Sequence, residues 1–272
     1  MVRSGGPAAA RGVATLSTGN FGLGVAYAAR GHGIDAAIVL PQGANPRKVA
    51  MIRRLGARIV EIPAGETGEA VLDAVAADAG YAVLRDGHDD RIANGAGTLA
   101  LEVTDAVADG RLPPIGTVYA PIGDGSLIAG VGTWLRSVSP SARVVGVQVE
   151  GAPAMARSWR SGRVEVVPPA LSRADGLTSG SGNPDLLDLL RRVVDDMVLV
   201  REEQLLDAQL ELFDALGVTA EASAAAAWLA ARDSRDDGAA TGVRLVIVTG
   251  SNAWPGELAG PTHRDPAEPW RS

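Results

Sequence analysis

Short apolar runs and longer amphipathic runs alternate along most of this chain. The apolar runs have strand length and occupy residues 12–16, 34–40, 57–62, 81–84, 116–120, 143–149, 193–200 and 243–249. Segments with helical spacing of apolar residues lie between them, at residues 21–30, 46–55, 66–79, 94–108, 127–136, 151–159, 201–216 and 219–232. Because strands alternate with helices, the pattern predicts parallel βαβ units and an α/β fold.

One long stretch interrupts the alternation. Residues 160–185 are rich in glycine, proline and serine, which predicts a long connection. Long connections are often functional, and this one contains the tetrapeptide 174–177, Ala-Asp-Gly-Leu. The last predicted strand, 243–249, is expected to be buried, and the proline-rich tail from Ala253 onward is expected to fray.

Composition narrows the class of protein. The chain has 272 residues, 46% of them hydrophobic, which is enough for one large domain or two small ones. A net charge of −7 without a basic cluster argues against a nucleic-acid partner. There are no cysteines, hence no disulfides and no thiolate chemistry. No apolar run reaches the roughly 18 residues of a membrane span, and the N-terminus lacks a signal-peptide core, so we expect a cytoplasmic protein.

The clearest candidate for chemistry is the loop after the strand at 116–120. Gly123 and Gly125 permit a sharp turn there, so that successive backbone N–H groups converge at the start of the next helix. Such a helix N-terminus binds phosphate well, and Ser126 adds a hydroxyl donor. The negative charge of Asp124 fits poorly unless its side chain points away. An ordinary βα turn is an equally open interpretation.

A second loop of the same kind follows the strand at 12–16. Ser17, Thr18, Gly19 and Asn20 stand directly before a helix. Their hydroxyl and amide groups, beside free N–H groups, suit a carboxylate or a ring hydroxyl. The same residues also favour a plain helix N-cap, and alone they indicate the cap more strongly than a binding site.

Two other kinds of site fit the sequence poorly. Gly123 and Gly125, with Glu150 after the next strand, resemble part of a dinucleotide fingerprint, but Ile128 stands where that fingerprint has its third glycine. The three histidines are scattered along the chain and there is no cysteine, which argues against a metal site built on histidine.

Taken in order, these motifs resemble those of pyridoxal-phosphate enzymes of the tryptophan-synthase-β type (fold type II), in the branch of serine/threonine dehydratases and threonine synthases. The match runs from about residue 11 to residue 252 and includes the glycine-containing segment 94–98. The resemblance implies that Ser17, Thr18, Gly19 and Asn20 bind the substrate carboxylate and that Asn20 also contacts the cofactor ring. It implies that the phosphate is held by Gly123, Asp124, Gly125, Ser126 and Leu127, and that Thr249 lies against the pyridine nitrogen.

The same resemblance implies two three-layer αβα domains with the cofactor cleft between them. Residues 11–95 would form the small domain, and residues 1–10 with 96–272 the large one, which lacks its N-terminal part. The implied reaction is pyridoxal-phosphate-dependent β-elimination on a hydroxy amino acid such as serine or threonine, giving a 2-oxo acid and ammonia. A neutral Thr249 at the ring nitrogen favours elimination over transamination. A homodimer and a small amino-acid substrate are the implied partners.

The chain also departs from the family's pattern. The family's cofactor-binding lysine lies in a Ser-Phe-Lys-like motif before the segment that matches residues 17–20, whereas the only lysine here, Lys48, matches a different family lysine. No catalytic residue is therefore assigned, and we expect a truncated sequence rather than an inactive relative. Asp124 replaces a glycine common in dehydratases. Ala156 stands where some relatives would have an acidic metal ligand, so no metal site is predicted.

Two alternatives to dehydration stay open. One is a replacement reaction like that of threonine synthase, which the spelling of residues 17–20 and 249–250 favours. The other is a catalytically inactive protein that binds pyridoxal phosphate or amino acids, because the lysine is absent.

Overall fold

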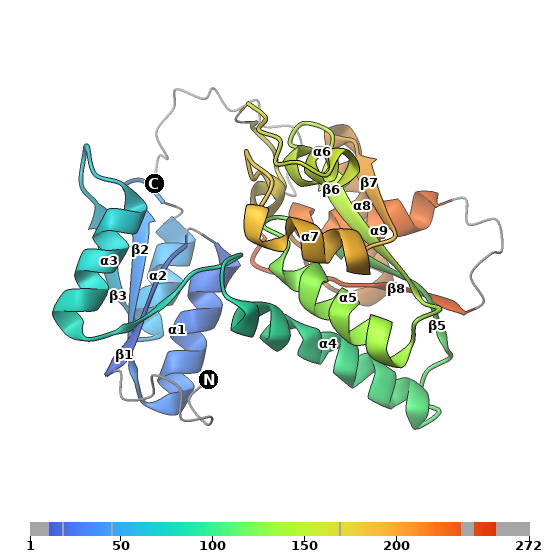
Figure 1. Cartoon of the computed structure of the whole chain (residues 1–272), viewed down its shortest axis with the longest axis horizontal. Coiled ribbons are helices and arrows are strands. Elements are labelled where there is room, and N and C mark those ends of the chain that lie inside the picture. Colours follow the sequence, from blue (N-terminus) through green and yellow to red (C-terminus); the bar gives the residue numbers. More distant parts are fainter. Residues whose placement is uncertain (1–10, 18, 45, 169, 235–241, 254–272) are drawn as a thin grey trace. The chain divides into compact units, whose positions relative to one another are not determined.

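The computed structural model describes residues 11–17, 19–44, 46–168, 170–234 and 242–253. The chain divides into two compact units (Figure 1). The described residues up to Asp89 belong to unit 1, and those from Asp90 onward belong to unit 2. The division falls just before a helix that starts at Asp90, so the domain boundary expected at residue 95 lies inside that helix.

Unit 1 contains one parallel sheet with the strand order β3-β2-β1-β4. Its strands and helices are β1 Gly12–Leu16, α1 Asn20–His32, β2 Asp35–Pro41, α2 Pro46–Arg54, β3 Arg58–Ile62, α3 Gly68–Ala79 and β4 Ala82–Leu84. Successive side chains of a strand point to opposite faces of the sheet. Ile38 and Leu40 therefore pack with α1 and α2, whereas Ala37 and Val39 pack with α3.

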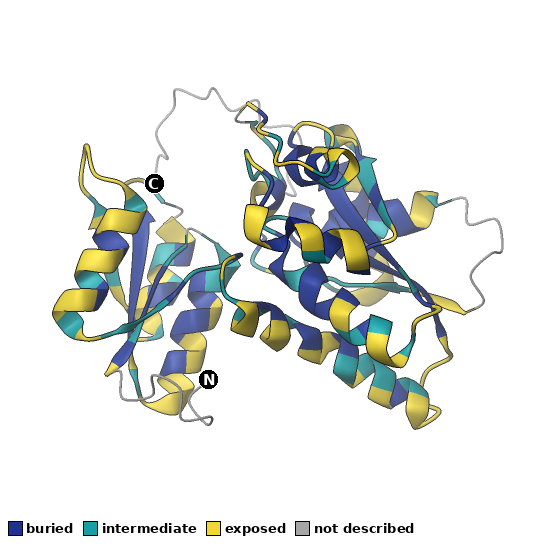
Figure 2. Ribbon diagram, viewed as in Figure 1, coloured by how far each residue is buried: buried dark blue, intermediate teal, exposed yellow. Residues whose placement is uncertain are grey.

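Unit 2 contains a second parallel sheet, with the strand order β7-β6-β5-β8. Its elements are α4 Asp90–Ala108, β5 Ile115–Pro121, α5 Ser126–Val138, β6 Arg143–Val149, α6 Ala154–Ser161, η2 Asp175–Leu177, α7 Pro184–Val193, β7 Asp196–Val200, η3 Glu202–Gln204, α8 Leu205–Leu216, α9 Ala222–Asp233 and β8 Val243–Val246. Helices α4 to α7 share one core cluster with the sheet, and α8 and α9 share another (Figure 2). None of the helices in the described residues is long and apolar enough to cross a membrane.

The α/β class with parallel strands is confirmed, but the bounds of several elements differ from the prediction, and three differences matter most here. Helix α4 begins at Asp90, before the predicted start at residue 94. Helix α7 was not predicted, and its last residue, Val193, had been assigned to the following strand. Strand β8 ends at Val246 and lies at the edge of the sheet, so it is only partly buried; Val243 is 39% exposed.

Helices α4 and α5 touch through glycine. A Cβ added to Gly130 would overlap the carbonyl oxygen of Ala93 and would lie 2.7 Å from the backbone nitrogen of Gly97. A Cβ on Gly97 would lie 3.0 Å from the carbonyl oxygen of Gly130. Glycine inside a helix costs about 1 kcal/mol relative to alanine. Here it allows two helix backbones to come into direct contact, which explains why the glycine-containing segment 94–98 is helical.

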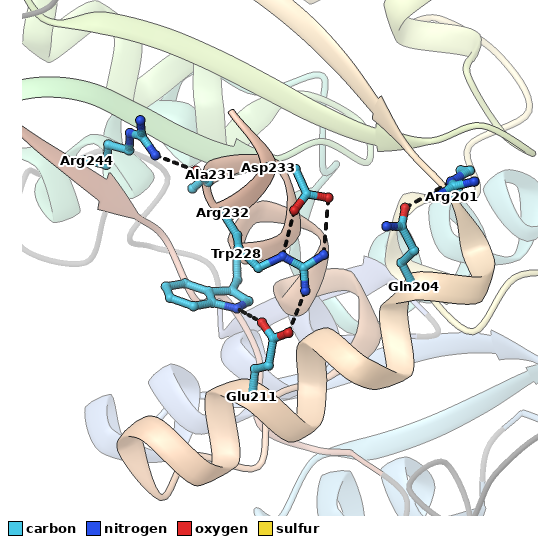
Figure 3. Close-up of polar contacts among 8 residues, drawn as sticks. All are labelled: Arg201, Gln204, Glu211, Trp228, Ala231, Arg232, Asp233 and Arg244. Carbon is cyan, nitrogen blue, oxygen red and sulfur yellow. Dashed lines mark hydrogen bonds and ion pairs between the residues drawn. The ribbon is translucent and has the colours of Figure 1, made fainter. Parts of the chain in front are cut away.

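A polar cluster joins helices α8 and α9 of unit 2 (Figure 3). Arg232 on α9 forms ion pairs with Glu211 on α8, at 2.6 Å, and with Asp233, at 2.7 Å. The indole N–H of Trp228 donates to the second carboxylate oxygen of Glu211, at 2.8 Å. Arg244 of β8 donates to the carbonyl oxygen of Ala231, at 3.0 Å, and so ties the end of α9 to the sheet edge.

We expect this cluster to make a small, pH-dependent contribution to stability. The hydrogen bond from Arg232 holds the pKa of Asp233 below its usual value of 3.8. A lowered pKa stabilises the fold above about pH 3.8, and this stabilisation is lost as the pH falls through the lower folded-state value. Because the side chains are partly exposed, Arg232→Gln should cost only about 0.5–1 kcal/mol at pH 7.

Urea unfolding of both proteins at pH 7 and pH 3 measures this effect, and the difference between them should shrink at pH 3. Arg111→Gln is the matched control, because Arg111 pairs at 3.0 Å with Asp109 on the exposed surface. It should leave the unfolding midpoint unchanged at both pH values. An equal loss for Arg232→Gln at the two pH values would contradict the assignment to ion pairing.

Candidate functional site

The predicted loops of unit 2 lie at one edge of its sheet. Strands β5, β6 and β8 are parallel, so their carboxyl ends meet at the same edge. The loop 122–125 follows β5, and the segment 247–252 follows β8. Ligands in open α/β sheets bind outside the carboxyl ends of the strands. The fold thus places residues 123–127 and Thr249 where a ligand would be expected.

The glycine loop has the backbone shape that the sequence predicts. Gly125 has a φ of +103° and is the N-cap of α5. A Cβ there would lie 3.0 Å from Leu190 Cδ1, in the core, so the site needs glycine both for its backbone angle and for space. A Cβ on Gly123 would overlap the carbonyl oxygen of Gly176. The two glycines let the loop lie between the core of unit 2 and the segment that contains Gly176.

The side chain of Asp124 folds back onto the donors of its own loop. The backbone N–H of Ser126 donates to Asp124 Oδ1, at 3.1 Å, and the Ser126 hydroxyl donates to Asp124 Oδ2, at 2.9 Å. Ser126 is 5% exposed, so this hydroxyl is part of the interior of the loop. The two Ser126 donors, which the family resemblance assigns to the cofactor phosphate, thus bind the carboxylate of Asp124 in this structure. The loop is an oxyanion-binding structure at the start of a helix.

Two segments far apart in the chain, around Gly176 and Ser223, support this loop. The backbone N–H of Gly176 donates to Ser223 Oγ, at 3.2 Å. Ser223 lies in the first turn of α9 and is 7% exposed. Since Gly176 also lies against Gly123, one side chain of α9 helps to place the wall of the glycine loop.

Glu221 holds the segment that follows β8. Its backbone N–H donates to the carbonyl oxygen of Gly250, at 2.9 Å, and its Oε1 accepts from the backbone N–H of Asn252, also at 2.9 Å. Glu221 is 7% exposed, so this carboxylate is a buried anchor. Thr249, next to the anchored residues, is itself exposed.

A buried glutamine joins the loop to the neighbouring helix. Gln148 on β6 donates to the carbonyl oxygen of Ile122, at 3.3 Å, and accepts from the backbone N–H of Ala156, at 2.8 Å. Ala156 and Ala154 are fully buried apolar residues. Among the described residues, no group of three or more His, Cys, Asp or Glu side chains could hold a metal ion.

The candidate carboxylate loop belongs to unit 1. Ser17 Oγ accepts from the backbone N–H of Gly22, at 3.0 Å, and of Gly19, at 3.3 Å. Asn20 is the first residue of α1, and Thr18 lies outside the described residues. Ser17 thus accepts from donors at the helix start, although the N-cap residue of α1 is Gly19. Lys48, on α2, is 7% exposed.

The sequence did not predict the supporting roles of Gln148, Glu221 and Ser223. Each contact joins residues far apart in the chain, so only the fold shows it.

Comparisons with known proteins agree with this arrangement. Residues 2–250 match the family model described as "Pyridoxal-phosphate dependent enzyme". The chain is 34% identical over 245 residues to the L-threonine ammonia-lyase of Thermotoga maritima, covering 89% of this chain and 59% of that protein. It is 34% identical to the phenylserine dehydratase of Ralstonia pickettii, covering 80% of this chain and 65% of the relative. The chain thus spans about three fifths of the length of the ammonia-lyase.

Solved structures give the same result. A threonine deaminase, from the organism abbreviated T.th., superposes with a TM-score of 0.80 at 33% identity, covering 89% of this chain and 78% of that one. Maize serine racemase superposes with a TM-score of 0.82 at 29% identity, covering 92% and 76%. The order of the motifs, the two parallel sheets and these similarities lead to one conclusion: the chain belongs to the family of pyridoxal-phosphate dependent enzymes.

Proposed function

We propose that this protein takes part in pyridoxal-phosphate-dependent β-elimination on a hydroxy amino acid, of the serine or threonine dehydratase type. The single observation that supports this most is the oxyanion-binding loop 123–126 at the carboxyl end of β5, in a chain of the pyridoxal-phosphate family. The names of two relatives, L-threonine ammonia-lyase and phenylserine dehydratase, indicate the reaction class.

The residues of the loop fit the cofactor's phosphate. The N–H and hydroxyl of Ser126 already bind an anionic oxygen, and the helix dipole of α5 adds a partial positive charge behind them. Gly123 and Gly125 have no side chain that would close the loop. We assign the phosphate to Gly123, Gly125, Ser126 and Leu127, next to Asp124.

Pyridoxal phosphate supplies an electron-withdrawing ring that stabilises negative charge on the substrate Cα. The protein's part is to bind and orient. Thr249 carries no charge, so a hydrogen bond from it would orient the ring without protonating its nitrogen. Asn20 would contact the ring oxygen, and Ser17, Thr18 and Gly19 would hold the substrate carboxylate through hydroxyl and backbone N–H donors.

A non-catalytic binder of the same cofactor is the second candidate. Its support is that Lys48, the only lysine of the sequence, lies on α2 of unit 1 and does not match the family's cofactor-binding lysine. The covalent link forms between the carbonyl group of the cofactor and a lysine amine at the family's position. A threonine-synthase-like replacement reaction, a homodimer and a cytoplasmic location stay predictions from the sequence.

We expect the cofactor to bind without a covalent link to this polypeptide. Borohydride reduction after saturation with pyridoxal phosphate should leave the intact mass unchanged, and serine or threonine turnover should be negligible. A longer chain that carries an upstream Ser-Phe-Lys-type segment should gain one pyridoxyl label and should form 2-oxo acid.

Lys48→Arg is the matched control for this experiment. A label on the wild-type chain that disappears in Lys48→Arg would show that Lys48 is the cofactor-binding amine and would contradict our assignment. The absence of any absorbance change on titration with pyridoxal phosphate would reject the cofactor site itself.

A further inference from the structure

Asp124, the one negatively charged residue of the loop 122–125, accepts hydrogen bonds from the donors at the start of α5. Both oxygens of Asp124 accept hydrogen bonds from Ser126, one from the backbone N–H and one from the hydroxyl. Gly125 between them has a φ of +103°, which turns the chain so that the carboxylate faces the start of α5. The side chain of Asp124 is therefore a carboxylate held in the place of a ligand oxyanion.

The phosphate site assigned above includes these two donors of Ser126. The N–H and hydroxyl of Ser126 point to the carboxylate at 3.1 and 2.9 Å, so an incoming phosphate oxygen must replace those bonds. The displaced carboxylate would stay beside the phosphate, because Asp124 is two residues from Ser126. Like charges at such short range repel each other, and solvent weakens this repulsion because Asp124 is partly exposed.

The carboxylate also has a role in the ligand-free protein. The first N–H groups of a helix lack partners within the helix, and a side-chain oxygen that accepts from one of them stabilises the helix. Gly125, the N-cap residue of α5, has no side chain to do this. Asp124 supplies the oxygen instead, and its negative charge interacts favourably with the helix dipole.

We propose that Asp124 is a built-in competitor for the cofactor phosphate: it stabilises the ligand-free loop and lowers the affinity of the loop for phosphate. This inference rests on the cofactor site proposed above and adds a property that belongs to this chain's own residue. It predicts that one substitution at Asp124 changes stability and phosphate affinity in opposite directions. Removal of the carboxylate should destabilise the ligand-free protein and strengthen phosphate binding.

The test compares the wild type with Asp124→Ala and Asp124→Asn. Affinities for pyridoxal phosphate and for inorganic phosphate are measured by titration calorimetry, and thermal unfolding is followed by circular dichroism with and without each ligand. Asp124→Ala should bind both ligands roughly tenfold more tightly, the size expected for one lost charge repulsion that is largely screened by solvent, because Asp124 is partly exposed. Asp124→Asn, which keeps an acceptor but no charge, should fall between. The ligand-free Asp124→Ala protein should unfold at a lower temperature than the ligand-free wild type. Ligand should raise its unfolding temperature by more than it raises that of the wild type.

Thr67→Ala is the matched control. Thr67 accepts from the backbone N–H of Ala70 at the start of α3 in unit 1, at 3.3 Å. Loss of this cap should lower the unfolding temperature without changing either affinity. Unchanged or weaker phosphate binding by Asp124→Ala would overturn the competitor role, because Asp124 would then only shape the loop. If neither the wild type nor Asp124→Ala binds pyridoxal phosphate, both this inference and the proposed cofactor site are overturned.

Discussion

Gly130→Val should unfold unit 2. The added Cβ would overlap the carbonyl oxygen of Ala93 and would lie 2.7 Å from the nitrogen of Gly97. Both atoms belong to the backbone of α4, so neither can move aside by a rotamer change. The two helices would have to separate along a buried contact, and we expect a loss of more than about 4 kcal/mol, a large part of a typical domain's stability.

Urea unfolding followed by circular dichroism measures this effect, and the expected result is loss of the cooperative transition of unit 2. Gly95→Val is the control, because Gly95 lies on the same helix and a Cβ there would meet no atom within 4 Å. It should leave the unfolding midpoint close to that of the wild type, because valine has a slightly better helix propensity than glycine. A wild-type unfolding midpoint for Gly130→Val would show that α4 and α5 do not touch as described.

Gly125→Val should abolish binding of pyridoxal phosphate. A β-branched residue does not adopt a φ of +103°, so the loop must change its path. The added side chain would also press on Leu190 and Leu186 of α7. The structure thus directs this Cβ into the core. Phosphate binding would still be lost, because the donors at Ser126 would no longer converge.

Absorbance titration with pyridoxal phosphate tests this prediction, with circular dichroism to show that the variant is folded. Gly110→Val separates backbone strain from the site effect. Gly110 has a φ of +72° at the end of α4, and a Cβ there would meet no atom within 4 Å. It should lose a comparable amount of stability and keep its affinity for the cofactor. Wild-type affinity in a folded Gly125→Val protein would show that the loop is only a structural turn.

The fold class followed from the sequence because each strand is a short apolar run bounded by polar or small residues. The predicted strands at 12–16 and 143–149 agree with β1 and β6 for this reason. Helix α7 escaped prediction because its start, with Asn183 as N-cap and Pro184 next, falls in the glycine- and serine-rich connection. Its final Val193 stands next to Val194 and so was assigned to the strand that follows.

The early start of α4 could not be predicted from local preferences. The missed residues are 90–93, which precede the predicted start at residue 94. Ala93 lies against Gly130 of α5, a contact between two elements distant in sequence that no local pattern encodes.

The location of the candidate loops of unit 2 at one edge of the sheet was predictable, but their contacts were not. Strand order and parallel direction explain why the loops after β5 and β8 lie at one edge. The direction of the Asp124 side chain depends on a rotamer choice that the sequence does not reveal. The anchoring role of Glu221 depends on a contact with Asn252, which no local pattern encodes.

Helix α9, which carries Glu221 and Ser223 at its N-terminal end, has a consequence for conformational entropy. Nine of its twelve residues are buried, and most of them are alanine. Alanine has no side-chain rotamers to lose, so enclosing this helix costs little side-chain entropy beyond that of the backbone. Ser223 and Glu221, which bind Gly176 and Gly250, thus lie at the N-terminal end of a helix whose burial costs little side-chain entropy. When a ligand binds, we expect the loss of conformational entropy to come mainly from the ligand and from the exposed Thr249, and little of it from α9.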